Sequence, residues 1–404
     1  MRRSWLIAVA LILLAAPAAR GDAVRIGLFS LFKPQVVEAR IVSGDGVMLD
    51  TNRIAGSRKL STGSRVRVEL AGEQLNVTVS DGFGGHRQIF TTTEARIHAN
   101  GAATIELVLP GKLRRSVRGE LTISASQRQR GTLNIVLTTE REAAVASVVA
   151  AETEARTPEA LKALAVVVRT FMLSHPNRHA ADDFDFCDTT HCQLYRGESD
   201  LAAEVKRPAV ASAVAATVGE HLVFAGKPLE AYFTASCGDL TATPQMVWGG
   251  ACNYPYARLR CDWCRASSHY RWTRQADARA VFDALASSLA TPLSQRAELV
   301  AESDAESGFV RAVVVRDGAR QWTMSTDEFR RITGRRLGWN KVLSQTFTIT
   351  RRGEQFIFRG KGFGSQVGLC LAGAVAQAQA GRRYEEILRF YFPRAEISSR
   401  RRVE

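Results

Sequence analysis

The hydrophobic periodicity of the chain changes close to Glu140. Before this residue, apolar and polar residues alternate in short runs, such as 66–70 and 75–79. A period of two is typical of strands that bury one face. After it, residues 142–151 read Glu-Ala-Ala-Val-Ala-Ser-Val-Val-Ala-Ala, which favours a buried helix that ends close to Glu152. We therefore expect an α+β fold with a β-rich amino-terminal region.

Further local signals mark elements in the second half of the chain. Thr157 can accept hydrogen bonds from the first amides of a helix, and Pro158 fits the first helical position. Residues 276–289 are typical of a surface helix. Residues 310–315 and 321–324 predict a hairpin with its turn at Asp-Gly. The carboxyl-terminal half is therefore expected to mix helices and strands.

The amino terminus has the three parts of a secretory signal peptide. Arg2 and Arg3 precede a short apolar run, and the small-residue stretch 15–19 follows it. The run is too short to cross a bilayer comfortably, and no later stretch reaches about 18 uninterrupted apolar residues. We expect cleavage after Ala19 or Ala23, and an uncleaved anchor is the alternative. Once the signal peptide is cleaved, we expect a protein with no transmembrane span, exported to the periplasm or cell envelope.

The charge balance points to an anionic partner. The 404 residues carry a formal net charge of +14, and 46% of them are hydrophobic, enough for one large core or two ordinary ones. Export argues against nucleic acid as the partner. Peptidoglycan, with its lactyl and peptide carboxylates, suits both the charge and the compartment. The alternative is that arginine is simply common in the source proteome.

One group of cysteines has the spacing of a metal site. In Cys187-x-x-x-His191-Cys192, two sulfurs and an imidazole could surround zinc, and His179 could add a ligand. The alternative is a Cys187–Cys192 disulfide, which an oxidising compartment would encourage.

The seven cysteines form an odd number, so at least one is unpaired, bound to metal or linked to another chain. For Cys252, Cys261 and Cys264 we expect one structural disulfide. The Cys261–Cys264 spacing is also that of a redox motif, whose thioredoxin-like context is missing, or of a metal knuckle.

Glu152 is the candidate catalytic acid. It follows an apolar helix, so its carboxyl is expected in a poorly hydrated place, where desolvation raises the pKa of a carboxyl group. A raised pKa is what a general acid needs to protonate a departing glycosidic oxygen near neutral pH. The alternative is a solvent-facing glutamate at a helix end, and Glu154 is a second candidate.

Three segments together resemble the SpoIID/LytB family, whose members degrade or help to degrade peptidoglycan. They are 148–152 with 159–170, 186–197, and 230–238 with 247–250. The resemblance runs from about 115 to 397 and is weaker before that range. It implies a SpoIID-like mixed core. We divide the chain into a signal peptide (1–23), a β-rich amino-terminal region (24–114), a SpoIID/LytB-like peptidoglycan-cleaving domain (115–397) and a charged tail (398–404).

The resemblance implies a lytic transglycosylase in which Glu152 is the catalytic residue. Hydrolases of glycosidic bonds usually need two carboxylates. In lytic transglycosylation the C6 hydroxyl of MurNAc attacks its own anomeric carbon, so one glutamate can serve as acid and then as base. The products of cleaving the MurNAc–GlcNAc linkage end in 1,6-anhydro-MurNAc. Some family members bind zinc beside this glutamate, which supports Cys187, His191 and Cys192 as metal ligands.

Several residues near these motifs are candidates for contact with the glycan. Lys162 and Arg169 lie two helical turns apart on one helix face, although a solvated stripe explains them equally. The polar residues of the cysteine-histidine segment could bind sugar hydroxyls or simply close a turn. Aromatic residues could stack on sugar rings or belong to the core. The candidate substrate-binding residues are Lys162, Arg169, Thr189, Thr190, Gln193, Tyr195, Tyr232 and Ser236.

The chain departs from the family pattern in its glycine-rich block. Gly364-Ser365-Gln366 stands where the family typically has Gly-His-Gly, Leu371 where it usually has glutamine, and Leu240 where it often has histidine. These changes remove polar groups that could line a saccharide groove. They support the alternative of a non-catalytic peptidoglycan-binding protein that stimulates a cell-wall amidase. A zinc-dependent peptidoglycan hydrolase is a third possibility.

Overall fold

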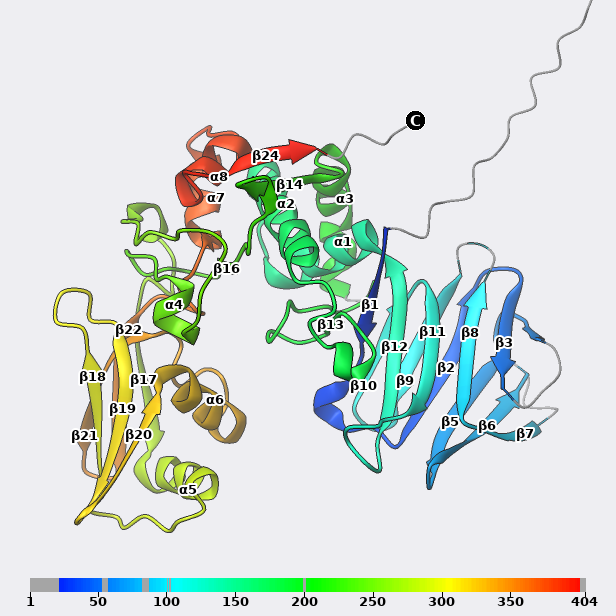
Figure 1. Ribbon diagram of the computed structural model, residues 1–404, viewed down its shortest axis with the longest axis horizontal. Coiled ribbons are helices and arrows are strands. Elements are labelled where there is room, and N and C mark those ends of the chain that lie inside the picture. The colour runs from blue at the N-terminus through cyan, green and yellow to red at the C-terminus, as the bar shows by residue number, and fades with distance from the viewer. Residues whose placement is uncertain are drawn as a thin grey trace, which may run out of the picture.

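Two antiparallel sheets form the amino-terminal part of the protein in the computed structural model (Figure 1). The structure describes residues 22–52, 57–81, 87–99, 101, 103–198 and 201–399. The predicted signal peptide up to residue 21, with its cleavage and anchor alternatives, and residues 400–404 of the predicted tail lie outside these ranges.

The first sheet has seven strands, in the order β13 (Phe186–Cys187), β1 (Ala23–Gly27), β12 (Leu133–Glu140), β11 (Glu120–Ala125), β8 (Glu94–Ala99), β3 (Val47–Thr51) and β4 (Arg58–Leu60). The second has six, in the order β10 (Leu113–Val117), β9 (Thr104–Leu109), β2 (Val36–Ser43), β5 (Arg65–Ala71), β6 (Gln74–Ser80) and β7 (Arg87–Thr92). A short 3₁₀ helix, η2 (Ser30–Phe32), follows β1. All described pairings in both sheets are antiparallel except β1 with β13, which is parallel.

The predicted alternation explains why the two sheets pack together. Val66 and Val68 of β5 are fully buried, and so are Ile97 of β8 and Ile123 of β11 in the opposite sheet. These side chains belong to one continuous hydrophobic core. Burial of each such side chain stabilises the fold by about 1.5–3 kcal/mol. The sandwich therefore provides a rigid edge, β1, on which β13 is added.

A helical layer follows the sandwich (Figure 1). α1 (Arg141–Glu152) continues directly from β12, and α2 (Pro158–Ser174) is buried on almost every side because alanine, valine and leucine fill most of its positions. α2 contacts α1, α3 (Leu201–Ala216), α7 (Leu371–Gln379) and α8 (Tyr384–Tyr391). A small sheet of β15 (Lys227–Pro228), β14 (Glu220–Phe224) and β24 (Glu396–Ser399) adjoins these helices.

Residues 271–361 form a lobe with a hydrophobic core of its own, seen at the left of Figure 1. The chain reaches it from β16 (Phe233–Thr234) through α4 (Pro244–Trp248) and returns to β23 (Leu369–Cys370), which pairs with β16 in parallel. The elements of the lobe are β17 (Arg271–Asp277), α5 (Ala278–Leu289), β18 (Glu298–Ser303), β19 (Val310–Asp317), β20 (Arg320–Ser325), α6 (Thr326–Leu337), β21 (Thr346–Arg352) and β22 (Gln355–Lys361).

The structure confirms the predicted α+β class and the β-rich amino-terminal region. The helix expected at 142–151 is α1, the surface helix is α5, and the predicted hairpin is β19–β20. Among the described residues, no helix is both long and apolar enough to span a membrane. The four domain boundaries drawn from the sequence stay predictions.

Candidate functional site

Glu152 is the last residue of α1, and its half-buried side chain turns toward the segment that follows the cysteine-histidine motif. The backbone amide of Leu194 donates a hydrogen bond to Glu152 Oε1 at 2.9 Å. Burial raises the pKa of the Glu152 carboxyl, and the bond from Leu194 and the charge of Arg196 only partly oppose this effect. The carboxyl group therefore holds its proton to a higher pH than an ordinary glutamate does.

Two further hydrogen bonds fix α1 against the same segment. Ser147 Oγ donates to the Gly197 carbonyl at 2.8 Å and accepts from the Arg196 amide at 3.3 Å. Gly197 has a φ of +73°, and a Cβ there would lie 2.2 Å from the Ser116 carbonyl oxygen. Only glycine suits this close approach, so the turn at Gly197 sets the register between Leu194 and Glu152.

The cysteine-histidine turn, residues 187–192, is attached to the sandwich through Asp188. This buried carboxylate accepts hydrogen bonds from the Phe29 amide at 2.9 Å and from Arg115 Nη1 at 2.7 Å. The Asp188 amide donates to the Gly27 carbonyl at 3.1 Å. Burial raises the pKa of Asp188, and the Arg115 guanidinium lowers it in part. The edge strand β1 thus holds the start of the turn in place.

Four potential metal ligands meet at this turn. His179, Cys187, His191 and Cys192 each offer an atom, and these atoms all lie within 4.8 Å of one another. His191 Nδ1 is 3.6 Å from Cys187 Sγ and 3.7 Å from Cys192 Sγ, and His179 Nε2 is 3.3 Å from Cys192 Sγ. Ligand atoms around tetrahedral zinc are separated by about 3.3–3.8 Å, given Zn–N and Zn–S bonds of about 2.0–2.3 Å. The residues present therefore fit zinc.

The surroundings of the four ligands support the same assignment. His179 Nδ1 lies 3.6 Å from Asp182 Oδ2, so a carboxylate is close to the ring nitrogen that does not face the sulfurs. Hydrogen bonds from Cys192, His191 and Thr189 lower the pKa of Cys187. Both cysteines of the motif are free, so the structure contains no Cys187–Cys192 disulfide.

Three predicted glycan-binding residues lie on this same turn. Thr189 Oγ1 contacts Cys187 Sγ at 3.2 Å and accepts from the His191 amide, while Thr190 is exposed. Gln193 is only 6% exposed, yet both polar atoms of its side chain lack a partner within the described part of the chain. A buried amide without partners is costly, so Gln193 is a group that a ligand could satisfy.

Tyr232 belongs to an aromatic cluster on a neighbouring segment. Its ring lies 4.9 Å from that of Trp248 and 6.1 Å from that of Tyr256, measured between centroids. Its hydroxyl donates to Glu230 Oε2 at 3.2 Å and lies 3.4 Å from His175 Nε2. Burial raises the pKa of Tyr232. Trp248 is 46% exposed, so the cluster presents an aromatic surface to solvent.

The remaining candidates are buried or paired with other side chains of the protein. Arg169 is 1% exposed and forms a bidentate ion pair with Glu142, and Lys162 pairs with Glu159 within α2. Tyr195 is buried in the core, and Ser236 is fully buried. Their predicted contacts with glycan rest on the sequence alone.

A second group of cysteines was missed by sequence reasoning. Cys237, Cys261, Cys264 and Cys370 are all buried, with sulfur atoms within 4.8 Å of one another, so they could hold a metal such as zinc. All seven cysteines, each in a described range, are free. The disulfide expected among Cys252, Cys261 and Cys264 is therefore absent, and Cys252 lies outside the group. The Cys261–Cys264 spacing was the one local signal, because the other two cysteines are distant in sequence.

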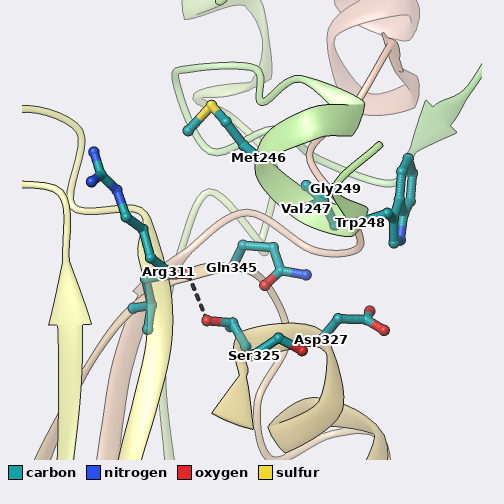
Figure 2. A pocket seen from close by; sticks show the side chains of 10 residues that line it. Met246, Val247, Trp248, Gly249, Arg311, Ser325, Asp327 and Gln345 are labelled. Atoms are coloured by element: carbon teal, nitrogen blue, oxygen red, sulfur yellow. Dashed lines mark hydrogen bonds between the residues drawn. The ribbon is translucent and has the colours of Figure 1, made fainter. Parts of the chain in front are cut away.

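A cavity of about 290 Å³ lies between α4 and the carboxyl-terminal lobe (Figure 2). Trp248 and Gly249 line one side, and Arg311, Asp327 and Gln345 line the other. Gln345 Nε2 is buried and has no partner among the residues that the structure describes. This cavity is not lined by Glu152 or by the cysteine-histidine turn, and it is a separate feature of the molecule.

Comparison with known proteins identifies relatives of this chain. Residues 129–224 match the family model described as SpoIID, Stage II sporulation protein. This range holds Glu152 and the whole cysteine-histidine turn, and it ends before the first of the four buried cysteines.

Among curated proteins, the chain is 30% identical over 246 residues to an uncharacterized protein of Brachyspira hyodysenteriae, covering 61% of this chain and 62% of that protein. It is 29% identical over 266 residues to Stage II sporulation protein D of Bacillus subtilis, covering 63% and 73%. It is 25% identical over 287 residues to the amidase enhancer of Bacillus subtilis, covering 60% and 38%. The chain thus spans under two thirds of the first of these relatives.

Proposed function

The chain belongs to the SpoIID family, and from this premise we propose that it is a peptidoglycan lytic transglycosylase of the cell envelope whose acid and base is Glu152. One observation carries the proposal. The Glu152 carboxyl has a raised pKa and is held by the Leu194 amide, two residues beyond the cysteine-histidine turn. Both features suit a residue that must deliver a proton at neutral pH.

The proposed reaction uses one carboxyl group twice. Protonated Glu152 gives its proton to the glycosidic oxygen, and the bond from the MurNAc anomeric carbon to that oxygen breaks. The resulting Glu152 carboxylate then takes the proton of the MurNAc C6 hydroxyl while the C6 oxygen bonds to the anomeric carbon. The products are a GlcNAc hydroxyl end and a 1,6-anhydro-MurNAc end. Water is not consumed, and Glu152 ends protonated, as it began.

The Leu194 amide has a definite part in this cycle. Its bond to Oε1 favours the charged form that exists between the two proton transfers, whereas burial favours the neutral form that begins the cycle. We assign the transferred proton to Oε2, the other oxygen of the same carboxyl group. Burial and the Leu194 bond thus act in opposite directions on Glu152, and each favours one of the two forms that the cycle uses.

Zinc has a supporting place in the proposal. His179, Cys187, His191 and Cys192 would hold it, and it would supply positive charge and rigidity rather than an attacking water. These four residues fix the turn that leads into Gln193 and Leu194.

Other side chains are assigned to the glycan. The unpartnered side-chain amide of Gln193 and the hydroxyls of Thr189 and Thr190 would bind sugar hydroxyls. The rings of Tyr232 and Trp248 would stack on sugar rings.

The proposal is tested by digesting purified glycan strands, with and without stem peptides, and identifying the products by mass spectrometry. We expect anhydro-muropeptides from the wild type and from Glu154→Gln, whose exposed carboxyl is the matched control. Glu152→Gln is expected to release about 10²–10⁴-fold less of them. Products with ordinary reducing ends, lost on chelation, would instead identify a zinc-dependent hydrolase.

A second candidate is a non-catalytic amidase enhancer. It is favoured by the likeness to a protein of that name and by the altered glycine-rich block, where Gln366 occupies a left-handed conformation with a φ of +64°. Such a protein would keep peptidoglycan binding and give no cleavage products. It would also raise the rate of a cell-wall amidase by the same factor in wild-type and Glu152→Gln forms.

A further inference from the structure

We propose that Cys237, Cys261, Cys264 and Cys370 bind one structural zinc ion. The four residues lie outside the range that matches the SpoIID family model, and the inference does not depend on the proposed transglycosylase activity. Cys237 follows β16, Cys261 precedes the 3₁₀ helix η4 (Asp262–Cys264), Cys264 is the last residue of η4, and Cys370 ends β23. Each side chain is at most 1% exposed.

The spacing of the sulfurs fits zinc better than it fits disulfides. All four lie within 4.8 Å of one another, and Cys237 Sγ is 3.6 Å from Cys264 Sγ. In a tetrahedral site with Zn–S bonds of about 2.3 Å, neighbouring sulfurs are about 3.8 Å apart. A disulfide requires about 2.05 Å. The chain therefore brings four free thiols within the separations that a single zinc ion requires, without joining any two of them.

The groups around the sulfurs are hydrogen-bond donors. The amides of Cys237 and Gly373 donate to Cys370 Sγ at 3.3 and 3.4 Å. The Tyr391 hydroxyl lies 3.2 Å from Cys261 Sγ and accepts from Gln377 Nε2 at 3.3 Å, which leaves its own proton to point at the sulfur. Donors aimed at sulfur stabilise thiolates, the form in which cysteine binds metal.

The backbone is shaped to let the sulfurs converge. Cys370 is the N-cap of α7, so the positive end of that helix faces its sulfur. A Cβ at Gly373 would lie 2.1 Å from the Tyr391 hydroxyl oxygen and 2.9 Å from Cys261 Sγ. Glycine at this position is what allows α7 to approach the group closely. Four thiolates buried together would repel one another, and a divalent cation is the partner that offsets their charge.

The site would organise a stretch of chain with little regular structure. Between β16 and β17 the described helices are only α4 and η4, each five residues or fewer. Zinc would join this stretch to α7, which packs against the central helix α2. The same stretch carries Trp248 and leads into the carboxyl-terminal lobe. The ion would therefore hold the aromatic surface and the base of the lobe to the helical layer.

Metal analysis of the purified full chain tests the inference. We expect Cys264→Ser/Cys370→Ser to lose about one zinc equivalent relative to the wild type, with a marked fall in Tm. Cys252→Ser, which changes a cysteine outside both groups, is expected to keep all of the metal. Cys187→Ser/Cys192→Ser is expected to lose only the metal held at the cysteine-histidine turn. Equal metal contents in the wild type and in Cys264→Ser/Cys370→Ser would overturn the inference.

Two measurements that leave the four cysteines intact keep the test valid if Cys264→Ser/Cys370→Ser does not fold. Cobalt substituted for zinc in Cys187→Ser/Cys192→Ser, which removes the thiolates of the other group, is expected to keep the intense thiolate-to-cobalt charge-transfer absorption of a four-sulfur site. Peptide mapping without reduction is expected to find the four cysteines as free thiols after metal removal. Disulfides among them, or no such absorption, would refute zinc binding.

Discussion

The Leu194 amide and the Glu152 carboxylate are joined by a 2.9 Å hydrogen bond that links α1 to the segment after the cysteine-histidine turn. Because Ser147 binds Arg196 and Gly197 in the same segment, the position of Glu152 depends on three contacts rather than on one side-chain rotamer. This anchoring gives the carboxyl a fixed place beside the turn, while burial keeps its pKa raised.

Glu152→Gln is expected to reduce glycan cleavage by about 10²–10⁴-fold, the usual contribution of a general acid. Glutamine preserves shape but has no proton to give. The rate is measured as release of anhydro-muropeptides, with Glu154→Gln as the control. An equal loss in both variants would mean that the effect is not specific to the buried carboxyl.

The pH dependence follows from the same raised pKa. Because the acid must be protonated at the start of the cycle, cleavage is expected to fall as pH rises through the raised pKa of Glu152. Stability should fall over the same window. Above the ordinary value of 4.5, and up to the raised pKa, the native protein binds more protons than the unfolded chain does.

The free energy of unfolding, measured in urea at several pH values, tests the second part. We expect the wild type to lose stability relative to Glu152→Gln as pH rises through that window, and no change below it. A constant difference between the two proteins would contradict a raised pKa at Glu152.

Asp188→Asn is expected to lower the free energy of unfolding by about 3–5 kcal/mol, because it leaves the Arg115 guanidinium in a buried site without its partner. Asp183→Asn is the matched control. It breaks an ion pair with Arg25 in which the Asp183 side chain is 78% exposed, and about 0–1 kcal/mol is expected. Similar losses in both variants would show that burial of Asp188 does not matter.

Gln366 combines a strained backbone with well-bonded side-chain atoms. Its φ is +64°, yet Oε1 accepts from the Gln345 amide and Nε2 donates to the Cys237 carbonyl at 2.7 Å. Gln366→Gly relieves the strain but removes these bonds, each worth about 0.5–1.5 kcal/mol. Gln366→Ala removes the bonds and keeps the strain, so it should be less stable than Gln366→Gly by about 1 kcal/mol. Chemical denaturation checks the order wild type, glycine, alanine, and a different order would contradict it.

Local patterns in the sequence were enough to predict the elements around Glu152. The alternating strands of the sandwich and the helix ending at Glu152 follow from periodicity, because the spacing of apolar residues shows which side chains of each element are buried. The resemblance to SpoIID/LytB proteins supplied the link between Glu152 and the cysteine-histidine motif. The structure joins the two: Glu152 accepts a hydrogen bond from the amide of Leu194, which lies two residues after Cys192.

Long-range packing was beyond the reach of those patterns. Cys370 joins Cys237 only because β16 and β23 pair, and nothing local marks that pairing. Lys162 and Arg169 do share a helix face, as their spacing requires. However, α2 is buried along most of its length, so Arg169 meets Glu142 in the interior instead of solvent. The separate core of residues 271–361 was likewise invisible, since periodicity does not say which apolar faces meet.

Arg271 and Lys361, the first and last residues of the lobe, lie directly opposite each other in the β17–β22 ladder. A segment whose two ends are neighbours can be shortened, lengthened or exchanged without pulling apart the chain on either side. Insertions or deletions within the lobe can therefore leave the contacts around Glu152 unchanged.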